Sequence, residues 1–94
     1  MKRLHTSLTS PLALDIMQML EYSGDTPRSP LWLTLSFAKQ GEWHTGIARR
    51  MRDMVHLKVI KRVEMLHVDS NKTFVAYLLT AKGKKFLYKE RDLK

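Results

Sequence analysis

The sequence predicts an α+β fold of three helices followed by a β-hairpin and a C-terminal helix. Two observations predict this order. A basic amphipathic segment, residues 45–52, precedes two β-prone segments, residues 59–68 and 73–79, which are separated by the turn residues Asp69-Ser-Asn-Lys72. The second β-prone segment then runs into Thr80-Ala-Lys-Gly83, where a capping residue precedes a helical pattern. We therefore expect a hairpin enclosed between two helices.

The first helix is predicted from its N-terminus. Ser10-Pro11 is a typical N-cap followed by a proline at the first helical position, where the missing N–H has no helical partner to lose. Apolar residues then recur at helical spacing until Gly24, which is a typical helix stop. These signals predict a helix over residues 11–23.

The second segment repeats the N-terminal signal but has an ambiguous pattern. Ser29-Pro30 is again a cap followed by proline, and Gly41 supplies a stop. Residues 31–37 alternate in a way that is typical of a strand. A helical stripe is also present, formed by Leu31, Leu35 and Ala38. We prefer a short second helix, with a short strand within residues 31–37 as the alternative.

The third helix is predicted over residues 43–56 and has a clear apolar face. That face consists of Ile47, Met51, Met54 and Val55. At about 100° per residue, Arg49 and His56 lie almost opposite this face and Arg50 lies on its flank. Thr45 is expected to cap the helix. The tryptophans that flank the turn before it, Trp32 and Trp43, are expected to pack in the core.

The start of the last helix contains two informative residues. Thr80 stands before Ala81 where an N-cap belongs, so we expect its hydroxyl to accept a hydrogen bond from the first turn. Gly83 lies inside the helix, where glycine costs about 1 kcal/mol relative to alanine. A close approach of the backbone to a neighbouring element would explain this glycine.

Length and composition limit the class of protein. The 94 residues fit one small domain, residues 1–94, and the absence of cysteine leaves apolar packing as the source of stability. No apolar run reaches the length of about 18 residues that a membrane span needs, and the basic N-terminus is not followed by a signal-like apolar segment. We expect a soluble, cytoplasmic protein.

The net charge of +8 is concentrated in one half of the chain. Residues 1–42 contain four Lys and Arg against four Asp and Glu, whereas residues 43–94 contain thirteen against five. A concentrated positive charge can serve solubility alone, but it also favours binding to polyanions through counterion release. Nucleic acid is the commonest polyanion in a cell, but the charge asymmetry by itself predicts only a polyanionic partner.

The basic third helix has the length and charge to enter the major groove of DNA. Arg49 and Arg52 are expected to contact guanine edges or phosphates, and Arg50 suits a phosphate. Asn71 and Lys72 at the tip of the hairpin can contact the adjacent backbone. The candidate DNA-binding residues are His44, Thr45, Arg49, Arg50, Arg52, Arg62, Asn71 and Lys72.

Residues 45–87 resemble the winged helix-turn-helix regulators of the MarR and PadR types. In that family the recognition helix runs into a G-L-[IV]-x-R strand, a wing that contains Asp, and the motif Y/V-x-L-T-x-x-G-x-x-x-L. The corresponding stretches here are Leu57-Lys-Val-Ile60-Lys-Arg62, residues 69–72, and Tyr77-Leu-Leu-Thr80-Ala-Lys-Gly83-Lys-Lys-Phe-Leu87. Lys58 stands where the family usually has glycine, and Lys72 replaces the wing arginine without its bidentate fork. We therefore expect the wing, residues 68–74, to bind the DNA backbone.

The resemblance implies a sequence-specific double-stranded DNA-binding transcription regulator, a repressor, that binds inverted repeats as a homodimer. The dimer surface is expected on the first and last helices, because a chain this short has little with which to cover their apolar residues. Those residues are Leu12, Ile16, Phe86, Leu87 and Leu93. Little chain remains to build a pocket, so we expect no small-molecule effector.

Other functions have less support in the sequence. His44, His56 and His67 lack the i, i+4 spacing of helical metal ligands, and no catalytic or cofactor motif is present, so we expect no enzyme, metal or cofactor. The main alternative is a winged-helix module, such as a phage or plasmid adaptor or antagonist, that binds an acidic protein partner. A second alternative is RNA or single-stranded DNA binding, which needs exposed stacking aromatics. Burial of Trp32, Trp43 and Phe74 would count against that alternative.

Overall fold

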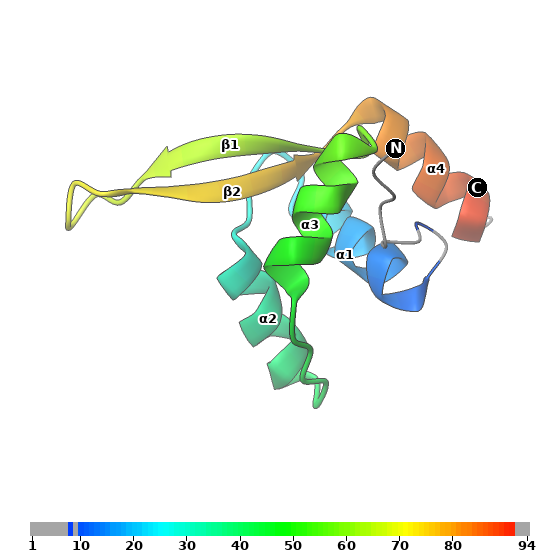
Figure 1. The fold of residues 1–94 in the computed structure, drawn as a ribbon, viewed down its shortest axis with the longest axis horizontal. Helices are drawn as coiled ribbons and strands as arrows, with labels where there is room; N and C mark the ends of the chain where they lie inside the picture. The colour runs from blue at the N-terminus through cyan, green and yellow to red at the C-terminus, as the bar shows by residue number, and fades with distance from the viewer. Residues whose placement is uncertain (1–7, 9, 92–94) are drawn as a thin grey trace, which may run out of the picture.

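The computed structural model describes Leu8 and residues 10–91, which form four helices and one antiparallel hairpin (Figure 1). The elements are α1 (Pro11–Tyr22), α2 (Pro30–Lys39), α3 (Ile47–His56), β1 (Ile60–Leu66), β2 (Thr73–Leu79) and α4 (Ala81–Arg91). The hairpin projects from the helical body on the side away from α4 (Figure 1). The predicted α+β winged helix-turn-helix architecture, with a hairpin wing between three helices and a C-terminal helix, is confirmed. Among the described residues, no helix has the length and apolarity that crossing a bilayer requires.

The capping signals predicted the starts of α1 and α2 correctly. The Ser10 hydroxyl accepts a hydrogen bond from the Ala13 N–H at 3.2 Å, and the Ser29 hydroxyl accepts one from the Trp32 N–H at 3.1 Å. A proline follows each cap at the first helical position. Local chemistry at Ser29 therefore outweighs the alternating pattern that follows it, and the strand alternative for residues 31–37 is wrong.

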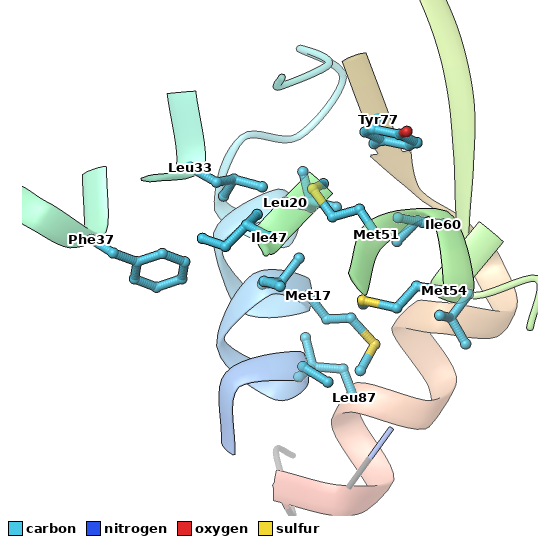
Figure 2. Close-up of a cluster of buried hydrophobic side chains, with 13 residues drawn as sticks. Met17, Leu20, Leu33, Phe37, Ile47, Met51, Met54, Ile60, Tyr77 and Leu87 are labelled. Atoms are coloured by element: carbon cyan, nitrogen blue, oxygen red, sulfur yellow. The ribbon is translucent and has the colours of Figure 1, made fainter. Parts of the chain in front are cut away.

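α2 buries a different stripe from the one that the sequence suggested. Leu33 and Phe37 are buried and point toward Ile47 (Figure 2), whereas Leu31 and Leu35 are exposed. Both pairs are separated by four residues, so the helical period fits either one. The contact of α2 with α3 decides which of the two pairs is buried.

A single bridge adds a third extended segment to the hairpin, upstream of α2. The Arg28 N–H donates to the Tyr77 carbonyl at 3.0 Å, and the Tyr77 N–H donates to the Arg28 carbonyl at 2.9 Å. The Arg28 side chain donates to the Ser23 hydroxyl at 3.0 Å, and its guanidinium lies 4.1 Å from the Trp32 ring centroid. β2 therefore has a hydrogen-bonded neighbour on each edge, β1 along its length and Arg28 at Tyr77.

One core joins all the elements. Figure 2 shows side chains from α1, α2, α3, the base of the hairpin and α4 converging on one another. Met17, Met51 and Met54 are fully buried within it. Their unbranched side chains fill the irregular space between α1, α3 and α4, as expected for methionine.

α4 packs against α1, and this contact changes the expected dimer surface. Ile16 of α1 and Leu87 of α4 are fully buried within the monomer. The contact is flanked by an ion pair of 2.6 Å between Arg91 and Asp15. The prediction that Ile16 and Leu87 are available for a partner copy is wrong, because each helix covers the apolar face of the other. Leu93, the last residue of that predicted surface, lies outside the described residues.

The start of α4 is locked onto the turn that joins α3 to β1. The Thr80 hydroxyl accepts a hydrogen bond from the Gly83 N–H at 3.0 Å and donates one to the Lys58 carbonyl at 2.7 Å. The Thr80 N–H donates to the Val59 carbonyl at 3.1 Å. The predicted cap at Thr80 is confirmed, and the same hydroxyl also ties α4 to a turn 22 residues earlier.

Replacing Thr80 with Val is expected to lower the free energy of unfolding by about 1–2 kcal/mol, because it removes a helix cap and a tertiary hydrogen bond together. Urea denaturation followed by circular dichroism measures the change. Thr80→Ser keeps the hydroxyl and is the matched control. Equal losses in the Val and Ser variants would contradict a role for the hydroxyl.

α3 ends in a turn that places Lys58 in the left-handed region, with φ of 68°. The Lys58 N–H donates to the Val55 carbonyl at 2.9 Å and the Val59 N–H to the Met54 carbonyl at 3.3 Å, which is the Schellman pattern. The corresponding residue after α2 is Gly41, with φ of 82°. Lys58 therefore occupies a position at which glycine is preferred.

Replacing Lys58 with Gly is expected to raise the free energy of unfolding by about 0.5–1 kcal/mol. The steric cost of holding lysine in the left-handed conformation exceeds the cost of the extra conformational entropy that glycine loses on folding. Thermal and urea unfolding of the two proteins measure the gain. Lys58→Ala removes the same charge but keeps the left-handed penalty, so it should show no gain. A Gly variant no more stable than the Ala variant would refute this account of the turn.

Candidate nucleic-acid interface

α3 divides its side chains between the core and the solvent. Ile47, Met51 and Met54 are buried, whereas Arg49 and Arg52 are exposed on the other side of the helix. The predicted apolar face is therefore confirmed. His56 is also exposed, Val55 is half-buried, and Arg50 is half-buried on the flank, as the helical projection predicted. The exposed side of α3 offers two guanidinium groups to a ligand.

α3 is shorter at its N-terminus than predicted, because it begins at Ile47 and not at residue 43. Its N-cap is Gly46, which has φ of 75° and makes no side-chain capping bond. The prediction that Thr45 caps α3 is wrong. Glycine takes this left-handed conformation without steric cost, so the chain turns into the helix one residue after Thr45. His44 and Thr45 thus lie in the connection from α2 and not on α3.

His44 packs against the core at the end of that connection. Its ring lies edge-on to Phe37, with 5.2 Å between the ring centroids. Its Nε2 atom is buried without a hydrogen-bond partner and lies 3.7 Å from a carboxylate oxygen of Glu42. The position of the ring holds the loop against α2, and it is less suited to reaching a DNA groove than the exposed side of α3.

The expected packing of the tryptophans is wrong for Trp43, which is 70% exposed. Trp43 follows Gly41, whose turn ends α2 and carries the chain outward before α3 begins. Trp32 and Phe74 are half-buried; Trp32 lies under the Arg28 guanidinium and Phe74 beside the His67 ring. The burial that would count against single-stranded nucleic-acid binding is therefore incomplete.

The wing presents its predicted contact residues at two different places. Arg62, near the base of β1, is exposed and lies 3.6 Å from the Glu64 carboxylate. Asn71 and Lys72 are exposed in the turn at the tip, where Asn71 has φ of 58°. The His67 N–H donates to the Lys72 carbonyl at 2.7 Å and the Asn71 N–H to the His67 carbonyl at 2.9 Å, so this backbone is ordered by its own turn. Strands of this length extend by about 20 Å, which separates the tip from the helical body.

The eight predicted residues therefore fall into distinct groups. α3 carries Arg49, Arg50 and Arg52, and the tip of the wing carries Asn71 and Lys72. His44, Thr45 and Arg62 lie outside both groups. A positive surface on α3 and a separate polar tip with Lys72 at the end of a projecting hairpin suit an extended ligand better than a small one. Assignment of these residues to DNA contacts stays a prediction.

Comparison of this chain with protein-family models, curated proteins and solved structures finds no match. Within Leu8 and residues 10–91, no three or more His, Asp or Glu side chains are grouped so that they could hold a metal ion.

Proposed function

We propose that this protein is a sequence-specific double-stranded DNA-binding transcription regulator, a cytoplasmic repressor, with α3 in the major groove and the wing on the adjacent backbone. The observation that carries the proposal is the division of α3 into a buried apolar face and an exposed face with Arg49 and Arg52. A helix fits the major groove, where arginine can bind the O6 and N7 atoms of guanine. The wing supports the proposal because Asn71 and Lys72 stand at its projecting tip.

The charge distribution supports the same partner. Residues 43–94 hold the whole net charge of +8, and they contain α3, the wing and α4. Each phosphate that such a protein neutralises releases condensed counterions, so its affinity for DNA depends steeply on salt. The positive charge of residues 43–94 therefore favours a nucleic acid over an uncharged ligand. The exposed arginines of α3 can read the sequence of that nucleic acid.

Selection of bound sequences from a random duplex pool tests the proposal. We expect enrichment of one motif, and an affinity for it at least about 10³-fold higher than for competitor DNA. The logarithm of the binding constant should fall linearly with the logarithm of the salt concentration. Binding that is equal for all duplexes and for heparin would refute sequence-specific regulation.

A homodimer on an inverted repeat is part of the proposal. Two half-sites about 10 base pairs apart in the enriched motif would match the spacing of one helical turn. Light scattering at micromolar concentration measures the mass, and a monomer on a single half-site would refute this part alone. Because Ile16 and Leu87 are buried within the monomer, a dimer has to use other apolar residues.

Exposed apolar residues favour a second candidate function, that of a protein-interaction module. Leu31 and Leu35 project from α2 with half or more of their surface exposed, one helical turn apart. An acidic protein would meet the positive charge of the second half of the chain, as an adaptor or antagonist requires. Duplex affinity no stronger than affinity for any polyanion, together with loss of partner binding in Leu31→Ser, would favour this candidate over the regulator.

A further inference from the structure

The fold sorts the charges of α4 into two groups. α4 contains five Lys and Arg residues and one Glu. Two of the cations face α1, where Lys84 lies 3.6 Å from Glu21 and Arg91 lies 2.6 Å from Asp15. The other three are Lys82, Lys85 and Lys89, which are exposed and have no ion pair with any other described residue.

These three lysines form one stripe. Their spacing of three and four residues places them within about 60° of one another around the helix, opposite the buried Gly83 and Leu87. The stripe is about 10 Å long at 1.5 Å per residue. Glu90, the one acidic residue of α4, projects from a different side, so the stripe has a single sign of charge.

The first turn of α4, which carries Lys82, lies beside the turn that ends α3. Thr80, which caps α4, donates its hydroxyl hydrogen to the Lys58 carbonyl at 2.7 Å. The exposed Lys58 therefore lies between the C-terminus of α3 and the first turn of α4. The wing projects on the opposite side of α3 from α4 (Figure 1), and the longest dimension of the molecule is 40 Å.

We propose that Lys82, Lys85 and Lys89, together with Lys58, form a second backbone-binding surface that contacts phosphates of the same DNA duplex, on the opposite side of α3 from the wing. This inference rests on the proposed function. A length of 40 Å corresponds to about 12 base pairs at 3.4 Å per base pair, so one molecule would cover about one turn of DNA. The surface adds affinity without reading bases, since a lysine binds phosphate as a point charge.

The first experiment measures the salt dependence of duplex binding. Replacing the three lysines of the stripe together with Gln keeps helix propensity and removes three exposed charges. We expect the slope of log K against log salt to fall by about 2–3 units, at about 0.9 for each phosphate that is no longer neutralised. The ratio of affinities for the selected motif and for competitor DNA should stay unchanged. Lys84→Gln is the matched control, because it removes a charge that faces Glu21, and its slope should change by less than about one unit.

The second experiment shortens the duplex. A half-site is placed at the centre of a duplex of about 20 base pairs, long enough for one bound molecule, and base pairs are removed from each end in turn. For the natural protein, we expect the affinity to fall when base pairs outside the motif are removed from the end of the duplex that α4 contacts. For the triple variant, we expect removal of base pairs from that end to leave the affinity unchanged. An unchanged slope in the triple variant would overturn the inference. A reduced slope with no dependence on duplex length would assign the lysines to a second duplex and would also overturn it.

The two proposals fail in different ways. If α4 makes no contact with DNA, the natural protein still selects one motif and the Arg49→Ala variant still loses affinity for it. If the protein is not a DNA-binding regulator, no motif is enriched and neither the α3 nor the α4 variants change a sequence preference. Circular dichroism and thermal unfolding of each variant show whether a lower affinity reflects a lost fold.

Discussion

Replacing Gly83 with Ala is expected to lower the free energy of unfolding by about 3 kcal/mol, the upper part of the range for an overpacked site. Helix propensity alone predicts the opposite, a gain of about 1 kcal/mol. A Cβ atom at this position would overlap the Val59 carbonyl oxygen and would lie 2.9 Å from its carbon and 2.8 Å from a methyl group of Leu79. Two of these three atoms belong to the backbone, so α4 as a whole has to move away from the α3–β1 turn.

Urea denaturation of Gly83→Ala and of an exposed control on the same helix tests this expectation. Lys85→Ala adds no atom to the interface and should change the stability by less than about 0.5 kcal/mol. A displaced α4 would also weaken the bonds from Thr80 to Lys58 and Val59. If Gly83→Ala is as stable as the natural protein, the close contact of α4 with Val59 does not exist in solution.

Replacing Arg49 or Arg52 with Ala is expected to weaken binding to the selected duplex by about 1–3 kcal/mol for each residue, which is about 5- to 150-fold. Both side chains are exposed on the face of α3 opposite the core, so neither change should lower stability by more than about 0.5 kcal/mol. An arginine that binds a guanine should lose preference at one position of the motif. Fluorescence anisotropy with a panel of singly substituted duplexes measures the affinity and the preference together.

Arg50→Ala is the contrasting variant for this experiment. Arg50 is half-buried on the flank of α3, where contact with a phosphate is expected. Loss of this side chain should weaken binding to all duplexes equally, and it should lower the slope of log K against log salt concentration by about one unit. If all three arginine variants keep the natural preference for the motif, α3 is not the recognition helix.

The sequence predicted the elements well wherever a short-range interaction decides the local conformation. Ser10 and Ser29 cap their helices as expected, and Thr80 caps α4. Gly83 was expected to mark a close approach of two backbone segments, and Val59 is the segment that it meets. In each case the cause is a hydrogen bond or a steric requirement that acts at a recognisable amino acid.

Prediction of the candidate site was less complete. The apolar face of α3 was predicted because its residues repeat at the helical period, and the exposure of Arg49 and Arg52 follows from it. The N-terminus of α3 was not predicted correctly, because Gly46 starts the helix without a side-chain cap and the sequence therefore contains no capping residue to recognise. Trp43 was misplaced because a large aromatic residue usually packs in a core, whereas here the turn at Gly41 leaves it exposed.

Amino-acid order alone was enough to establish the succession of helices and strands, the helix caps, and the concentration of charge in residues 43–94. Only the tertiary structure decides which side chains of these elements remain exposed to solvent. α2 has two equivalent stripes, and contact with α3 buries the one that holds Leu33 and Phe37. α1 covers Leu87 and pairs with Lys84 and Arg91, which leaves the other three lysines of α4 unpaired among the described residues. Burial and ion pairing depend on elements that are distant in the chain, and periodicity within one element carries no information about them.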